Sequence, residues 1–157
     1  MAGNTRDRIR AFEAAEASLR DCESLLGGSG ALPEFNGENG MHEARDLSDP
    51  EIYKKYKGKR IYEEYGDDTD GSPGQWLGKS GGSVRVIPQV GGVPAIPDVA
   101  EQPRCIIERI EIETRRRSDE RSGPPVTPSE FFYRITAVGY GTNPGTTANL
   151  QTTFRRP

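Results

Sequence analysis

The stretch MAGNTRDRIRAFEAAEASLRDCESLL, residues 1–26, decides the fold of this chain. Apolar residues in this stretch recur at intervals of three and four: Phe12, Ala15, Leu19, Cys22 and Leu26. This spacing places them on one stripe of an α-helix. Gly27 and Gly28 follow at once, and glycine is the residue that most often ends a helix. We therefore predict an amphipathic helix over residues 1–27, and we expect any sheet in the protein to pack on it.

The composition fits a single domain, residues 1–157, with long loops. Only 32% of the residues are hydrophobic, and the chain contains 19 Gly and 12 Pro. The formal net charge of -3 does not suit binding to nucleic acid or to an anionic membrane. No apolar run is long enough to cross a bilayer. Because the chain opens directly on a helix, we expect the native protein to extend further in the N-terminal direction.

Strand-like segments dominate the second half of the chain. We interpret residues 28–83 as a variable helix-to-sheet region, with a short helix that begins at Asp49 and Pro50. Residues 84–157 are interpreted as an antiparallel sheet, with strands at 84–87, 104–114, 131–139 and 147–155. Short connections between the last strands predict a meander. The expected fold class is α+β, one long helix packed on an antiparallel β-meander of about four strands.

Two cysteines, Cys22 and Cys105, leave two interpretations open. A disulfide between them would close a loop of roughly 80 residues and stabilise the fold by about 4 kcal/mol. Two buried free thiols are the alternative. That alternative is favoured if Ile110 and Ile112 face the helix, because Cys105 would then point away from it. Either the strand at 104–114 is buried on both faces near its start, or a β-bulge shifts its phase.

An acidic run, Asp67, Asp68 and Asp70, is similar to part of a calcium loop because oxygen ligands alternate before a glycine. The run lacks a third ligand before that glycine and a distant bidentate Glu, so a solvated turn is the preferred interpretation. His42 has no second His or Cys at metal-ligand spacing and is predicted to lie on the surface. We therefore predict no metal and no cofactor.

No set of residues in the sequence suits catalysis. A single histidine rules out most Ser-His and Cys-His arrangements. The glycine-rich segments 74–80 and 139–145 are similar to phosphate-binding loops. The first is one residue short and precedes a strand, and Pro144 interrupts the second. We interpret both as loop glycines and predict that the protein is not an enzyme.

The two ends of the chain resemble one protein family. Residues 1–21 look like the segment just past the membrane span of PilX-type minor pilins of type IV pili, with the pattern M-A-G-N-x-R-D-R-x-x-A-F-x-A-A-E-A-x-L-R-D. Residues 133–157 resemble the C-terminus of the same family, where Y-R-[IV]-T-A-x-G-x-G precedes L-Q-[ST]-x-[FY]. The two stretches cover about a third of the chain.

The resemblance implies a structural subunit rather than an enzyme. Such a subunit would be anchored in the inner membrane by an apolar helix half ahead of Met1, with this domain in the periplasm, and would later lie at the extracellular pilus tip. Its partners would be other minor pilins, in a complex that primes pilus assembly, and a large tip adhesin. The oxidising periplasm also makes a disulfide between Cys22 and Cys105 the expected state. Many pilins instead place their disulfide between C-terminal strands.

On this resemblance, the helix at 1–27 would bury Phe12, Leu19 and Leu26 against its own sheet. It would offer its charged residues to partner subunits: Arg6, Arg10, Glu13, Glu16 and Arg20. Exposed sheet edges offer a second route, in which a neighbouring subunit adds a strand.

Two alternatives stay open. A pseudopilin of a type II secretion system would have the same fold in a different machine. A freestanding secreted module that binds carbohydrate or calcium could use Tyr62, Tyr65 and Trp76 beside the acidic run at 67–70, because aromatic rings near carboxylates suit sugar binding.

Overall fold

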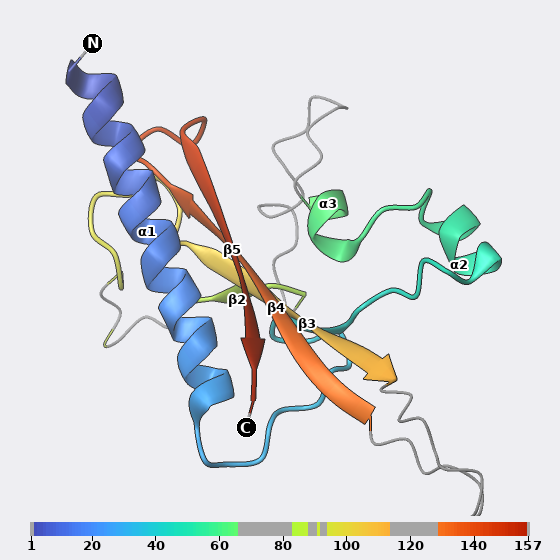
Figure 1. Cartoon of the computed structure of the whole chain (residues 1–157). Helices are drawn as coiled ribbons and strands as arrows, with labels where there is room; N and C mark the ends of the chain where they lie inside the picture. The colour runs from blue at the N-terminus through green and yellow to red at the C-terminus, as the bar shows by residue number, and fades with distance from the viewer. Residues whose placement is uncertain (1, 66–82, 88–90, 92–93, 114–128, 157) are drawn as a thin grey trace, which may run out of the picture.

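The computed structural model of the chain describes residues 2–65, 83–87, 91, 94–113 and 129–156. One long helix, α1 (Ala2–Gly27), lies across one face of a five-stranded sheet (Figure 1). Two short helices, α2 (Pro50–Lys55) and α3 (Ile61–Tyr65), stand on the side of the sheet away from α1. The predicted α+β class and the predicted long helix are confirmed.

Three long strands form the centre of the sheet. They are β3 (Arg104–Glu113), β4 (Ser129–Tyr140) and β5 (Thr147–Arg155), and each pairs antiparallel with the next, as the predicted meander requires. The other edge of β3 pairs with β2 (Arg85–Val86), antiparallel, and with β1 (Met41–Glu43), parallel. The sequence did not predict β1, because three residues are too few to show an alternating pattern.

The register of β3 settles the conflict in its sequence pattern. Its pairing with β4 runs without interruption from Arg104 opposite Val138 to Glu113 opposite Ser129, so no bulge shifts the phase. Cys105 and the residues that alternate with it therefore face α1. The residues between them face α3, and the strand is buried on both sides near its start: Cys105, Ile106, Ile107 and Glu108.

Two hydrophobic clusters result from this arrangement. The first lies between α1 and the sheet and includes Leu26, Ile107 and Ile135. The second lies on the opposite face, where Ile61 and Tyr65 of α3 cover Ile106. These clusters hold α1 and α3 on opposite faces of the same strands.

One part of the predicted core is wrong. Phe12 is 46% exposed, although its spacing placed it on the buried stripe of the helix. Ile112, whose orientation the sequence left open, lies on the face away from α1 and is 43% exposed. The residues that face the sheet from α1 are smaller ones, and this determines which side chains of the helix remain free.

Candidate functional site

α1 lies close to the sheet because the side chains between them are small. These side chains are fully buried: Ala11, Ala14, Ala15 and Ser18. Beneath them β4 carries Gly139, where an added Cβ would overlap the backbone of Ala11 and Ala15. We predicted Gly139 to be a loop glycine, and this is wrong. It is the position where the backbones of helix and strand meet.

A disulfide ties the second half of α1 to the sheet. Cys22 and Cys105 are bonded, with their Cα atoms 6.6 Å apart, and both are fully buried. The bond closes a loop across a sequence separation of 83. The expected disulfide is confirmed, and it is possible because Cys105 lies on the face of β3 that α1 covers.

Polar contacts fix the rest of the helix. The Asp7 carboxylate accepts hydrogen bonds from the backbone N–H and the hydroxyl of Thr142, at 2.5 Å and 2.6 Å. These bonds, with one from the hydroxyl of Thr146, lower the pKa of Asp7 from 3.8 to about 2. Further along the helix, Arg85 Nε donates to Asp21 Oδ2 at 2.6 Å. α1 is thus attached to the β4–β5 turn at one end and to β2 near the other.

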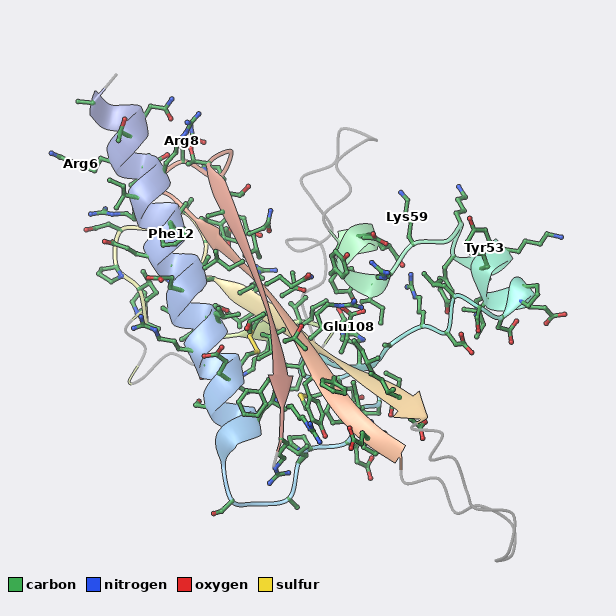
Figure 2. All side chains as sticks on the ribbon, in the orientation of Figure 1. Arg6, Arg8, Phe12, Tyr53, Lys59 and Glu108 are labelled. Atoms are coloured by element: carbon green, nitrogen blue, oxygen red, sulfur yellow. A yellow bond between two sulfur atoms is a disulfide. The ribbon has the colours of Figure 1, made fainter. Side chains whose placement is uncertain are left out.

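The opposite face of α1 carries two large apolar side chains. Ile9 is 54% exposed and Phe12 is 46% exposed. Arg6, Glu13 and Arg20 are exposed on the same side of the helix, and within the described part of the chain none of them forms an ion pair. Figure 2 shows Arg6 pointing away from the sheet. The helix therefore presents a mixed apolar and charged surface, which we call the outer helix face.

The sequence-predicted interface residues divide into two groups. Arg6, Glu13 and Arg20 lie on the outer helix face, whereas Glu16 is half-buried. Arg10 is held by its own chain, because its Nη1 donates to the Asp98 backbone oxygen at 3.2 Å and lies 3.6 Å from the Asp98 carboxylate. Ile9 was not predicted to be an interface residue, and Phe12 was predicted to lie on the buried stripe. The run of small residues that includes Ala11, Ala14 and Ala15 was the signal that could have identified the buried side.

A comparison with protein families decides the identity of the chain. The model for the type IV pilus assembly protein PilX, C-terminal region, matches residues 38–156. The chain belongs to the PilX family. The match covers nearly all of the C-terminal stretch, residues 133–157, that resembles the family. It begins after the N-terminal stretch, residues 1–21, that also resembles it. No curated protein and no solved structure matches this PilX-family pilin.

The family membership makes the protein a minor pilin of the type IV pilus assembly system, and thus a pilus-associated protein that interacts with other pilus components. The family is one of structural pilus components rather than of enzymes. Within the described residues, no helix is both long and apolar enough to cross a membrane.

The side of the pilin's sheet that faces α3 contains a buried polar group. Glu108 is fully buried and accepts a hydrogen bond from Arg134 Nε at 2.9 Å (Figure 2). His42 lies beside it in the β1–β3 pairing, and its Nε2–H donates to the Ser83 carbonyl at 2.6 Å. The predicted surface position of His42 is wrong, because the side chain is only 8% exposed. Burial also raises the pKa of the Tyr65 hydroxyl.

Two ligand sites were considered from the sequence, one for calcium and one for carbohydrate. The described part of the pilin contains no group of three His, Cys, Asp or Glu side chains that could hold a metal ion. The calcium candidates Asp67, Asp68 and Asp70 lie outside the described residues, as does Trp76. Tyr65 is buried, and the Tyr62 ring is stacked under the Arg134 guanidinium, 4.8 Å away. Of the aromatic residues considered for a carbohydrate-binding module, Tyr65 is therefore unavailable to a ligand, and one face of the Tyr62 ring is occupied by Arg134.

Proposed function

We propose that this pilin joins other minor pilins in a complex that primes type IV pilus assembly, lies at the pilus tip and holds a large tip adhesin. The observation that supports the proposal is the outer helix face of α1, where large apolar side chains lie exposed on a helix that packs on the sheet. The role is structural, without catalysis. The matching family is named for type IV pilus assembly, which favours this machine over a type II secretion system.

The location follows from the same role. We propose that an apolar helical segment ahead of Met1 anchors the subunit in the inner membrane, with this domain in the periplasm, until the complex enters the pilus. The disulfide between Cys22 and Cys105 supports an oxidising compartment.

The contact would combine apolar burial with charge pairing. Ile9 and Phe12 each expose about half of their side-chain surface. Removing that surface from water would stabilise a complex by about 1 kcal/mol per side chain. The proposed charged contacts add specificity more than affinity. They are Arg6, Arg10, Glu13, Glu16 and Arg20. Of these, Arg6 and Arg20 are best suited to testing, because reversing Arg10 would also break its contact with Asp98.

The test compares substitutions on the outer helix face with a matched substitution elsewhere. The double variant Ile9→Ala, Phe12→Ala should keep its fold but bind the other minor pilins about 30-fold more weakly, because about 2 kcal/mol of apolar burial is lost. Tyr53→Ala on α2 is the control, since Tyr53 is 56% exposed and lies on the other side of the sheet. Binding is measured by titration of purified subunits, and pili are counted by electron microscopy.

Unchanged binding in the double variant, together with unchanged binding after Arg6→Glu and Arg20→Glu, would exclude the outer helix face as the contact. Thermal unfolding of each variant separates a lost contact from a lost fold. Because none of these side chains is buried, the melting temperature of each variant should stay unchanged.

A further inference from the structure

The outer edge of β3 is only partly covered. Along this edge β2 pairs with Arg104 and Cys105, and β1 pairs with residues 107–109. Beyond Arg109, β3 continues for four more residues, Ile110 to Glu113, that pair with β4 alone among the described residues. From Ile110 to Glu113, the second edge of β3 therefore has no described strand beside it.

The direction of the backbone groups at this edge follows from the bonds before it. Ile107 N donates to the Gly40 oxygen at 2.7 Å, and Ala44 N donates to the Arg109 oxygen at 2.9 Å. Backbone groups alternate between the two edges of a strand, so those of Glu111 and Glu113 point outward as well. Their N–H and C=O groups continue the ladder that β1 leaves at Ala44. An edge of this kind can accept a further strand.

A cleft of about 450 Å³ lies where β1 leaves this edge, and its lining is charged: Glu43, Ala44, Arg45, Asp46, Arg109, Ile110 and Glu111. Both guanidinium groups of the lining already have carboxylate partners, since Arg45 pairs with Glu64 and Arg109 pairs with Glu43. Asp46 and Glu111 are exposed, and neither forms an ion pair with a described residue. The charge that the cleft offers to a ligand is therefore negative.

We propose that this edge binds an extended segment of a partner protein that carries Lys or Arg, as a strand added along Glu111 and Glu113. The segment's backbone would pair with the outward N–H and C=O groups, and its cations would lie near Asp46 and Glu111. Ile112, 43% exposed on the face away from α1, offers an apolar contact to the same strand. The inference goes beyond the proposed function, because it requires no contact with the outer helix face.

The test uses a defined probe, a capped peptide of about six residues in which Lys and Val alternate. Titration followed by amide NMR should shift the signals of Glu111, Glu113 and Ala44. The variant Glu111→Pro removes an outward N–H, and proline is tolerated at a sheet edge. It should weaken binding about fivefold, the value of one hydrogen bond. A probe with N-methyl groups on alternate residues keeps its charge but cannot pair, and it should bind at least as weakly.

A charge reversal keeps the test informative even if Glu111→Pro alters the strand. Glu111→Lys should weaken binding several-fold and reduce its dependence on salt. The matched control is Glu51→Lys, exposed on α2, which should leave binding unchanged. The proposal is overturned if the probe does not bind at millimolar concentration or if it shifts signals elsewhere. It is also overturned if the N-methylated probe binds equally well, or if Glu51→Lys and Glu111→Lys weaken binding alike.

Discussion

Reduction of the disulfide between Cys22 and Cys105 should remove a large part of the stability of this pilin. The bond closes a loop across a sequence separation of 83. Closing a loop of that length restricts the unfolded chain, and the standard loop-entropy relation gives about 4.6 kcal/mol near room temperature. Both cysteines are fully buried, and free thiols are tolerated in an apolar core, so the reduced form loses the cross-link without gaining an unpaired polar group.

The size of this loss decides whether the domain survives reduction. A domain of this kind has a total stability of about 5–15 kcal/mol, so a loss of about 4.6 kcal/mol removes between a third and nearly all of it. We expect the reduced protein to be marginally folded. Because the unfolded chain also becomes less compact without the cross-link, the dependence of unfolding free energy on urea should become steeper.

Urea unfolding followed by circular dichroism, with and without reductant, measures the effect. We expect the midpoint to fall by about 2 M urea in the reduced protein. The double variant Cys22→Ala, Cys105→Ala is the control, because its midpoint should not respond to reductant. A difference in unfolding free energy below about 1 kcal/mol would refute the loop-entropy reasoning. Two thiols that react with a thiol reagent in the unreduced, unfolded protein would refute the bond itself.

Three further predictions concern the contacts of α1. Hydrogen bonds depress the pKa of Asp7 to about 2, so they stabilise the fold above pH 3.8, and this stability is lost as the pH falls towards 2. In urea titrations, the unfolding free energy of Asp7→Asn should fall less between these two pH values than that of the unmodified protein. An unchanged pH profile would contradict the contact between Asp7 and Thr142. Ser18→Ala should raise the melting temperature slightly, because the buried Ser18 hydroxyl has no hydrogen-bond partner among the described residues. A fall in the melting temperature would contradict this reasoning. Gly139→Ala should lower the free energy of unfolding, measured in urea, by about 3 kcal/mol. Gly3→Ala is the control, because the space around Gly3 is open and the substitution should be neutral or stabilising. Equal effects of the two substitutions would contradict the close approach of helix and strand.

The long elements could be predicted from the sequence because their apolar residues repeat over enough positions to form a recognisable pattern. The helix over residues 1–27 repeats its apolar stripe several times, and β4 and β5 alternate over most of their length. Two of the short elements, β1 and α3, were not predicted. β1 and α3 contain three and five residues, which pair or pack only because the finished sheet provides a neighbour.

The wrong prediction for Phe12 has a physical cause in the packing of α1 on the sheet. Hydrophobicity places a residue on a face of a helix, but the distance between helix and sheet decides which face is buried. Phe12 belongs to an apolar stripe, yet it is exposed because Ala11 and Ala15 allow the backbone of α1 to approach Gly139. A Phe at the interface would hold the helix further away. His42 was misjudged for a related reason, since its burial depends on β3 and on Ser83, which lie far from it in the sequence.

The same geometry connects the fold to assembly. A helix that packs through small residues leaves its large apolar side chains on the outside, where Ile9 and Phe12 lie. Neither side chain belongs to the hydrophobic core, and the proposed contact with a partner subunit would remove both from water. The disulfide, the Asp7 contacts and the Asp21–Arg85 pair keep α1 in one position. A partner that covers the outer helix face therefore loses little free energy in ordering it, and a modest contact area can support a stable complex.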